Sequence, residues 1–417
     1  MKRFLAIIAL VLSTLLLLSI SACSTAKSDG YGGGYGHGMA GGAEVAPGAD
    51  GAGDMGDIAV GGGEAVDSSD KQEIQIAPGQ LTACAYNDNE HFEFWRGLIG
   101  QDGEFNSYYA FAFKTYNRIK LQLTKGVYAR VDLLGENGVI HTAVSDANGV
   151  CYLFSEKYSE EYKIRITTFN KGEEVQSERT ITGDSEIEVS GDGFERVVQI
   201  MFVIDATGSM GDEMAYLNSE ITDVINKVLS ANQGYVVELA IMVYRDKGDD
   251  YVTRYSEFTT DANAQKEFLN RQGPNGGGDF PEAVQTALSE AAGVQYWKTK
   301  ATKVLVHVAD APAHNEDVPT WKNAVHALSE KGVRIITVAS SGINKQTEYF
   351  FRSQSMLTNG DYVYLTNHSG IGNDHLEATV EEQPVVEYLN SCLVRLINGY
   401  ISGEFASPVF FGNDIQQ

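Results

Sequence analysis

The chain has 417 residues and a formal net charge of −25, from 31 Lys and Arg residues against 56 Asp and Glu residues. This acidic balance argues against nucleic acid and anionic lipid surfaces as partners, because both are themselves negatively charged. The length leaves room for two folded domains.

The first residues have the pattern of an export signal. Lys2 and Arg3 precede an uncharged apolar run from Phe4 to about Ile20, as in a secretion signal. The tetrad that ends in Cys23 resembles a bacterial lipoprotein box, which implies that residues 1–22 are removed and that Cys23 is lipidated. An uncleaved signal anchor is the alternative, since the run is about the length of a short transmembrane helix. Both alternatives tether the chain to a membrane outside the cytoplasm.

A glycine-rich acidic stretch follows and predicts a disordered tether over residues 23–79. Between Gly30 and Gly63 it has almost no large aliphatic residue, so it cannot bury enough apolar surface to fold by itself. Flexible-coil scaling gives it a reach of roughly 40 Å. We expect it to hold the folded part away from a membrane, and a spacer without a selected length fits equally well.

Short alternating strands are predicted between residues 80 and 190. Turn signals such as Glu136-Asn137-Gly138 separate them, and the pattern favours a small all-β sandwich. The stretch 144–154 resembles carboxypeptidase-regulatory-like and other immunoglobulin-like modules. Cys84 and Cys151 fall in this segment and could pair, although the sequence does not give the distance between them. The predicted strands are Arg118–Leu123, Tyr128–Leu134, Val150–Phe154, Tyr162–Thr168 and Arg179–Ile181.

From residue 195 to 400, apolar runs alternate with helical patterns. The alternation predicts an α/β fold with a doubly wound, mostly parallel sheet, followed by a C-terminal tail at 401–417. Helical stripes are expected from Met214, over Pro319–Lys331 and over about Pro384–Asn398. The expected strands are Val197–Ile204, Val236–Tyr244, Lys303–Ala309, Val333–Ala339 and Tyr362–Leu365.

Oxygen-bearing side chains follow the ends of two of these strands and open a later helix. In open α/β sheets, ligands bind at the carboxyl edge of the strands. Hydroxyl and carboxylate donors suit Mg²⁺ or Mn²⁺ and disfavour Zn²⁺, which prefers nitrogen and sulfur. The sequence therefore predicts a magnesium or manganese site with the candidate residues Asp205, Thr207, Ser209, Asp279 and Asp310.

Each candidate also has a purely structural explanation. Asp205 could only end a strand, and Thr207 with Ser209 could only cap the helix that follows. Asp310 could begin a turn. Asp279 has the position of an N-cap, with Glu282 as its capping-box partner. Four further residues are predicted near the same edge in hydrogen-bonding rather than ligand roles: Tyr244, Arg245, Asp246 and His314.

The order of the motifs Asp205–Ser209, Gly276–Glu282 and Ala309–His314 resembles that of a von Willebrand factor type A domain, over about half the chain. The resemblance implies that Thr207 and Ser209 bind a divalent ion directly, while Asp205 and Asp310 act largely through water. Thr207 stands where many members have Ser, which keeps the oxygen. Asp279 stands where adhesive members often have Thr, so it would make the ion less electrophilic.

These features predict a lipid-anchored extracytoplasmic protein of the cell membrane or outer membrane. Its type A domain is expected to bind a protein or glycan partner that offers a carboxylate, with no catalytic residues. Two alternatives stay open: a structural envelope protein with a vestigial metal site, and a metal-dependent hydrolase. Thr207 stands where aspartyl-phosphate chemistry of the haloacid-dehalogenase type needs a second Asp, and the loop at Gly273–Gly278 lacks the Lys-Ser/Thr pair of a nucleotide-binding loop.

Overall fold

The computed structural model describes residues 76–293 and 296–412, which belong to one compact unit. The predicted export signal, Cys23 and most of the predicted tether lie outside these residues. Among the residues that the structure describes, no helix is long and apolar enough to cross a bilayer.

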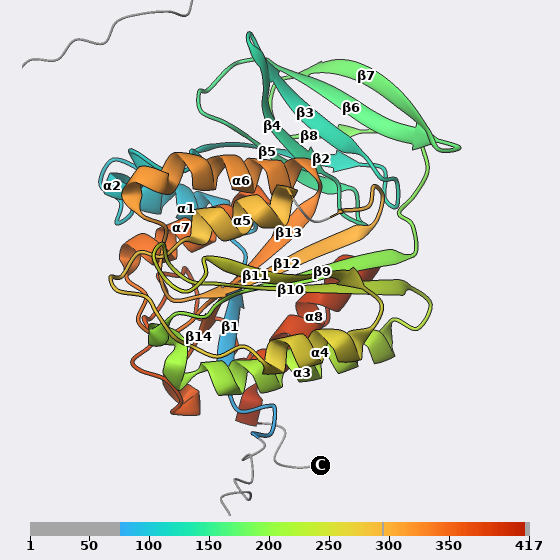
Figure 1. Cartoon of the computed structure of the whole chain (residues 1–417). Coiled ribbons are helices and arrows are strands. Elements are labelled where there is room, and N and C mark those ends of the chain that lie inside the picture. The colour runs from blue at the N-terminus through green and yellow to red at the C-terminus, as the bar shows by residue number, and fades with distance from the viewer. Residues whose placement is uncertain (1–75, 294–295, 413–417) are drawn as a thin grey trace, which may run out of the picture. The chain divides into compact units, whose positions relative to one another are not determined.

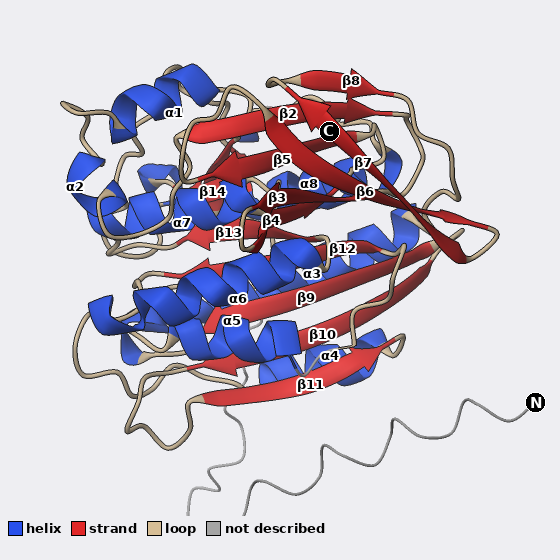
Figure 2. Cartoon of the chain, turned by 90° about the horizontal axis from the view of Figure 1, so that it is seen from above, coloured by secondary structure: helices blue, strands red, loops and turns tan. Residues whose placement is uncertain are grey.

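The larger part is an eight-stranded sheet with the order β11-β10-β9-β12-β13-β14-β1-β15 (Figure 2). Its central strands run parallel and are buried on both faces, which explains their nearly continuous apolar sequences. β11 (Thr253–Thr259) pairs antiparallel with β10 at one edge. The mostly parallel pairing of the sheet confirms the predicted α/β fold class. The parallel strands are β9 (Val197–Asp205), β10 (Val236–Tyr244), β12 (Thr302–Ala309), β13 (Val333–Ala339) and β14 (Tyr362–Leu365).

Helices cover both faces of this sheet (Figure 1). One face carries α5 (Val284–Gly293), α6 (Val318–Glu330) and α7 (Lys345–Leu357). The other carries α3 (Met214–Ala231), α4 (Ala262–Asn270) and α8 (Leu389–Ser402). In α3 the buried side chains recur at helical spacing, as the sequence predicted: Met214, Leu217, Ile221, Val224, Ile225 and Val228.

The segment around β1 (Thr82–Tyr86) belongs to the large sheet, although it lies within the range predicted as β-sandwich. β1 pairs antiparallel with β14 and with β15 (Glu387–Tyr388). The helices α1 (Phe92–Ile99) and α2 (Asn106–Tyr109) follow, and buried aromatic residues of this segment stack against α7. The segment joins the large sheet because β1 pairs with strands far along the chain, and its local sequence pattern does not predict such pairing.

Residues 117–187 form two small sheets that share one core. One sheet has the order β5-β2-β8 and the other β4-β3-β6-β7, mostly with antiparallel pairing. This part contacts α6, where Ser329 Oγ donates to Thr142 O over 2.7 Å. The strands are β2 (Asn117–Leu123), β3 (Arg130–Gly135), β4 (Gly138–Val144), β5 (Val150–Ser155), β6 (Tyr162–Asn170), β7 (Glu173–Ile181) and β8 (Ser185–Ile187).

Two details differ from the sequence expectations. The last helix begins at Leu389 rather than Pro384, because residues 387–388 form β15 against β1. Cys84 and Cys151 are free and buried, so the pairing considered for them is wrong. The two cysteines lie in different sheets, β1 and β5. Cys392 is a buried free thiol on α8.

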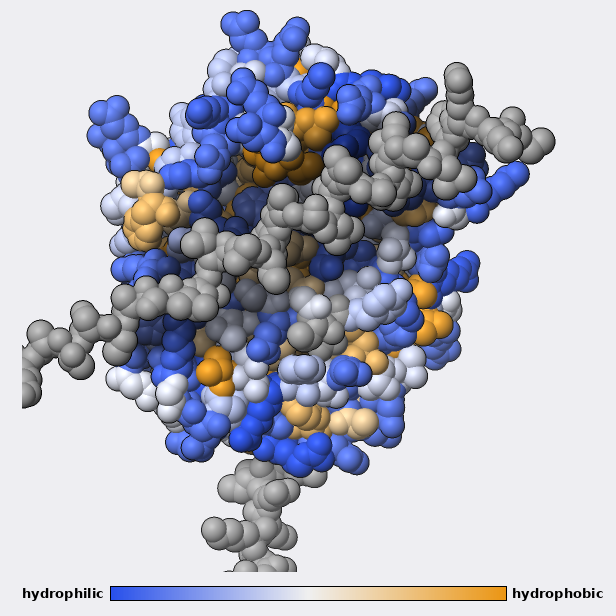
Figure 3. Space-filling model, turned by 45° about the horizontal axis from the view of Figure 1, so that its top comes forward, coloured by the Kyte–Doolittle hydropathy of each residue, from blue (hydrophilic) through white to orange (hydrophobic). Residues whose placement is uncertain are grey.

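The surface seen in Figure 3 is mostly hydrophilic. Hydrophobic residues form small separate patches among the hydrophilic ones. The exposed large hydrophobic side chains include Val139, Tyr158, Val236 and Tyr255, from different strands and loops. Scattered single residues of this kind need no functional explanation.

Candidate metal centre

Two neighbouring parallel strands bring Asp205 and Asp310 to the same edge of the large sheet. β9 ends at Asp205, and Asp310 follows the last residue of β12, with Val308 in register with Ile204. The chain passes from β9 to β10 on one side and later reaches β12 on the other. β9 and β12 therefore flank a topological switch point, where open α/β sheets bind ligands.

The turn after β9 draws three side chains together. Asp205 Oδ1 accepts hydrogen bonds from the backbone N–H of Thr207 over 2.9 Å and from Thr207 Oγ1 over 2.7 Å. Thr207 Oγ1 lies 3.1 Å from Ser209 Oγ. Asp205 and Thr207 are fully buried, whereas Ser209, in the short helix η1 (Gly208–Asp212), is exposed. The predicted convergence of these oxygens is therefore present, with Ser209 at the solvent side.

A second loop supplies a buried acid to this cluster, and that acid is Glu282. Its side chain is 2% exposed, and its N–H donates to Pro312 O over 2.9 Å, in the loop after Asp310. A Cβ atom on Gly277 would lie 2.9 Å from Glu282 Oε1 and 3.3 Å from Thr207 Cβ, so both side chains reach the same place. Gly277 has φ 72°, which favours glycine there.

Asp279 lies in a different group from the one predicted. It is exposed, and one ligand atom from each of Asp246, Asp279 and His314 lies within 4.8 Å of the others. His314 Nε2 is 3.2 Å from Asp246 Oδ1. The capping alternative for Asp279 is wrong, because α5 begins five residues later at Val284. Asp246 and His314, for which the sequence favoured hydrogen-bonding roles, thus join Asp279 in a possible metal-binding group.

The loops that carry these acids are fixed by backbone contacts. Asp249 Oδ2 accepts from the N–H of Asp246 over 3.1 Å and from that of Gly277 over 2.9 Å. Arg245 directly precedes Asp246 in the chain. Its guanidinium donates to Ala206 O over 3.0 Å and to Gly273 O over 2.9 Å. The guanidinium therefore orders the backbone around the cluster, and its hydrogen bonds go to carbonyls.

Burial and mutual repulsion keep the carboxyl groups from ionising easily. Burial, followed by the charge of Asp310, raises the pKa of Asp205 to about 7. Burial, together with Glu213 and Asp212, raises the pKa of Asp310 to about 6, although Ser209 opposes the shift. Burial, followed by Asp205 and Asp246, raises the pKa of Glu282 to about 9. Such shifts are characteristic of a group of acids that lacks a compensating cation.

Three oxygens of the cluster have no hydrogen-bond partner among the described residues: Asp205 Oδ2, Glu282 Oε2 and Asp310 Oδ1. A buried polar atom without a partner is costly, and buried charges are normally paired or bind metals. A divalent cation would satisfy these oxygens together. Carboxylates and hydroxyls form a donor set of the hard type that Mg²⁺ and Mn²⁺ prefer, whereas the outer group adds an imidazole.

A chain of buried hydrogen bonds lies next to Asp205. Tyr244 is in register with Asp205 on the neighbouring strand, and its hydroxyl partly offsets the rise in the pKa of that carboxyl. Tyr244 Oη lies 3.1 Å from His307 Nε2, and His307 Nδ1 lies 2.8 Å from Gln354 Nε2. Because an amide N–H₂ can only donate, Nδ1 accepts and the proton of His307 is on Nε2. Burial lowers the pKa of His307 to about 3, so it stays neutral at physiological pH.

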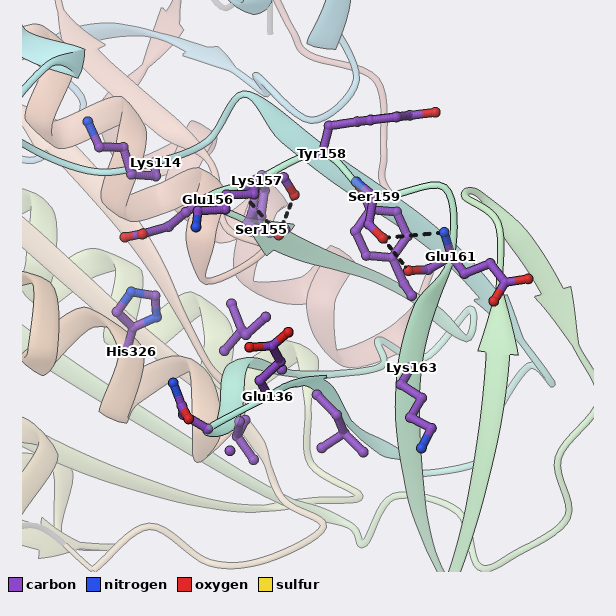
Figure 4. Close-up of a pocket in the computed structure, with 18 of the residues that line it drawn as sticks. Lys114, Glu136, Ser155, Glu156, Lys157, Tyr158, Ser159, Glu161, Lys163 and His326 are labelled. Atoms are coloured by element: carbon purple, nitrogen blue, oxygen red, sulfur yellow. Dashed lines mark hydrogen bonds between the residues drawn. The ribbon is translucent and has the colours of Figure 1, made fainter.

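A large hollow of about 700 Å³ lies away from this cluster, between the β3–β4 hairpin, the loop after β5 and α6. Figure 4 shows its side chains, with Lys114, Glu156 and His326 on one side and Lys163 on the other. Its lining contains both acidic and basic side chains, together with the exposed Val139 and Ile140. We place the candidate site at the carboxylates instead, since the buried groups without partners there call for a ligand.

Part of the chain is similar to known proteins. Residues 199–372 match the model of the von Willebrand factor A domain family. An ariadne-like RING finger protein of Acanthamoeba polyphaga mimivirus is 24% identical over 192 residues, which is 41% of this chain and 18% of that protein. Alpha-protein kinase vwkA of Dictyostelium discoideum is 22% identical over 168 residues, which is 40% of this chain and 27% of that protein. The chain thus spans less than a third of the length of each of these curated relatives.

Among solved structures, the conserved hypothetical protein BatB from Bacteroides thetaiotaomicron is 14% identical to this chain. The match covers 52% of this chain and 93% of that one, with a TM-score of 0.27. A score this low supports no argument about shared topology.

Proposed function

We propose, from the premise that residues 199–372 form a von Willebrand factor A domain, that the chain binds an extracytoplasmic protein or glycan ligand through Mg²⁺ or Mn²⁺. The observation that carries this proposal is the set of three buried carboxylate oxygens without partners beside the hydroxyls of Thr207 and Ser209. They lie at the carboxyl edge of the sheet, where this class of fold binds ligands.

The residues of the cluster have separate roles in this proposal. Thr207 and Ser209 would hold the cation directly, as the family resemblance implies, while Asp205 and Asp310 would hold its bound water. Glu282 takes the place that the sequence suggested for Asp279, because it is the buried acid of the second loop. An open coordination position on the cation would supply the contact to an oxygen of the ligand.

Two ligand chemistries follow from this set of residues. A partner carboxylate is the first, as expected for an adhesive type A domain. The third buried carboxylate, Glu282, favours a glycan hydroxyl as the second, because a cation already surrounded by three carboxylates attracts a fourth less strongly. Glu282→Gln removes this excess charge and should favour the carboxylate ligand.

Calorimetry of the full chain with chelator, with Mg²⁺ and with Mn²⁺ tests the site. A cation that binds only the folded state stabilises it by about 2.7 kcal/mol at 100 times its dissociation constant. We expect this response in the wild type and its loss in Asp205→Ala. An equal response in both would show that Asp205 does not belong to the site.

Asp279→Asn is the matched variant for the outer group. It removes one exposed carboxylate and should leave the response nearly intact if the cation is held by Asp205, Thr207, Ser209, Glu282 and Asp310. A response lost in Asp279→Asn and kept in Asp205→Ala would move the cation to Asp246, Asp279 and His314. No response in any variant would favour the structural envelope protein with a vestigial site.

We also propose that Cys23 carries a lipid anchor, on the evidence of the apolar run and tetrad before it. Cys23→Ser should then shift the chain from the membrane fraction to the soluble fraction. A variant that stays in the membrane, with an N-terminus upstream of residue 23, would indicate an uncleaved signal anchor.

A further inference from the structure

A second, smaller hollow lies where the β-sandwich meets the amino-terminal end of β12. Its volume is about 290 Å³. The sandwich contributes Tyr128, Arg130 and Thr167 to its lining, and the α/β part contributes Trp297, Lys303 and Lys331. It is distinct from the metal centre, which lies past the other end of the same strand.

Lys303 is a buried cation that forms no salt bridge with a described residue, although Glu174 and Glu330 also line the hollow. Its side chain is 2% exposed, and among the described residues its Nζ has one hydrogen-bond acceptor, Lys331 O at 2.5 Å. That carbonyl belongs to the C-cap of α6, where a cation is favourable, but two N–H groups of the ammonium remain. A lysine is almost never fully buried unless it is paired.

The charges that act on the ammonium of Lys303 are positive. Burial, followed by the charges of Arg334 and Lys331, lowers the pKa of Lys303 to about 7. Arg130 adds a half-buried guanidinium to the same lining, 3.5 Å from Asp132 Oδ1. The lining thus holds three basic residues against the two acids Glu174 and Glu330, and an anion would neutralise the buried Lys303.

Thr167 gives a second, independent indication of a ligand. Its side chain is 1% exposed, lines the hollow, and leaves Oγ1 without a hydrogen-bond partner among the described residues. Buried hydroxyls are nearly always hydrogen-bonded. Thr167 lies on β6 and Lys303 on β12, so the two unsatisfied groups come from different parts of the fold.

Aromatic side chains complete the lining. Tyr128 is 4% exposed and Trp297 is 9% exposed, and Lys303 Nζ lies 5.7 Å from the ring centroid of Tyr128. Trp297 Nε1 already donates to Ala291 O, so its ring offers mainly apolar surface. Rings of this kind bind flat apolar groups well.

We propose that this hollow binds a small organic anion, whose carboxylate or phosphate group contacts Lys303, Arg130 and Thr167 and whose apolar body lies against Tyr128 and Trp297. Both kinds of ligand, the carboxylate and the phosphate, carry a group of anionic oxygens on a small apolar body. Because both parts of the fold contribute, the bound anion would also link the β-sandwich to the α/β sheet.

Four probes separate the sources of the anion: benzoate, phenyl phosphate, acetate and inorganic phosphate. Each is titrated into the full chain by calorimetry, with chelator present so that the metal centre stays out of the measurement. We expect benzoate or phenyl phosphate to bind more tightly than acetate and inorganic phosphate. Binding of inorganic phosphate alone would indicate a phosphate site without a role for the aromatic residues, and absence of binding by all four would overturn the proposal.

Two variants test the named groups. Lys303→Met keeps the apolar stem and should weaken binding by roughly tenfold or more, because hydrogen bonds to charged groups are the strong ones. Thr167→Val removes one hydroxyl without changing the shape, so it keeps the proposal testable if Lys303→Met folds poorly. Lys163→Met, on β6 in the larger hollow of Figure 4, removes the same charge elsewhere and should bind like the wild type. Equal affinity in Lys303→Met, Thr167→Val and the wild type would rule out this site.

Discussion

The two ends of β12 bury opposite charges. Near its start, Lys303 is 2% exposed beside other cations, and directly after its end, Asp310 is 5% exposed among other carboxylates. Neither charge is neutralised by a described side chain of opposite sign. The same strand therefore places a cation and a carboxylate, each without a counter-charge, at opposite edges of the sheet. Each group is suited to a ligand whose charge is opposite to its own.

Arg352 shows what a fully paired buried charge looks like in the same fold. Its side chain is fully buried, its Nη2 lies 2.6 Å from Asp88 Oδ1, and its Nη1 lies 2.9 Å from Glu348 Oε1. This pairing holds the segment after β1 against α7. A buried charge that serves stability is therefore paired by the protein itself, in contrast to both ends of β12.

Arg352→Met is expected to lower the free energy of unfolding most among the substitutions that distinguish paired from unpaired buried charges. The change leaves Asp88 buried without its cation and Glu348 with Lys345 alone, and breaking a buried pair in this way costs about 3–5 kcal/mol. Urea unfolding of the full chain measures the loss. Lys303→Met is the matched control and should not show this loss, because no acid depends on Lys303 for its counter-charge. Similar losses in the two variants would refute the distinction between paired and unpaired charges.

Tyr244→Phe is expected to have the next largest effect on the free energy of unfolding. It tests the hydrogen bonds of Tyr244 and His307 next to the acidic end of β12. It removes the hydroxyl that lies 3.1 Å from His307 Nε2, so the Nε2–H group of His307 is left buried without an acceptor among the described residues. Such a loss costs about 1–3 kcal/mol. Tyr362→Phe is the control, since Tyr362 Oη is buried without a hydrogen-bond partner in the described part of the chain, and its removal should be neutral or stabilising. Equal destabilisation by both substitutions, in denaturant unfolding, would contradict the role of Tyr244.

The acidic end predicts a fall in stability with rising pH when chelator is present. The folded-state pKa values of Asp205, Asp310 and Glu282, about 7, 6 and 9, lie above the ordinary values of 3.8 for Asp and 4.5 for Glu. The folded state therefore binds more protons than the unfolded state, and this stabilisation is lost as pH rises through about 6 to 9. Unfolding midpoints between pH 5 and pH 9 measure it. Saturating Mg²⁺ should flatten the curve, and a rise in stability over this range in chelator would contradict the assignment.

The basic end predicts a smaller change of opposite sign. The folded-state pKa of Lys303 is lowered to about 7 from 10.5, so the folded state binds fewer protons than the unfolded state. Its contribution to stability therefore rises with pH between about 7 and 10.5. The difference between the wild type and Lys303→Met should grow in favour of the wild type over this range, whereas Lys163→Met should show no such trend. A flat difference for Lys303→Met would indicate that its ammonium is not buried in the folded state.

The parallel strands of the large sheet could be predicted closely because their signal is local. Runs such as Val236–Tyr244 and Val333–Ala339 are mostly apolar and are bounded by turn residues, and the structure has the same bounds. The edge strand β11 was not predicted, because its exposed positions include charged residues such as Arg254 and Glu257. Its place depends on pairing with β10.

The candidate site was predictable in part. Asp205, Thr207 and Ser209 lie within one turn after a buried strand, so their convergence follows from local geometry. The second loop was not predictable to the residue, since Asp279 and Glu282 are three positions apart in the same glycine-rich segment. The sequence did hold a signal for Glu282, which directly precedes the apolar pair Ala283-Val284, but a capping partner explained it equally well.

The sequence by itself determined the alternation of strands and helices, the order of the three motifs and the excess of acid, because periodicity and composition are local properties. Only the tertiary structure decided that β1 pairs with β14, that Glu282 is buried while Asp279 is exposed, and that Lys303 lies beneath the β-sandwich. These outcomes depend on contacts between residues far apart in the chain. The burial that shifts a pKa or leaves an oxygen without a partner exists only once those distant segments have packed together.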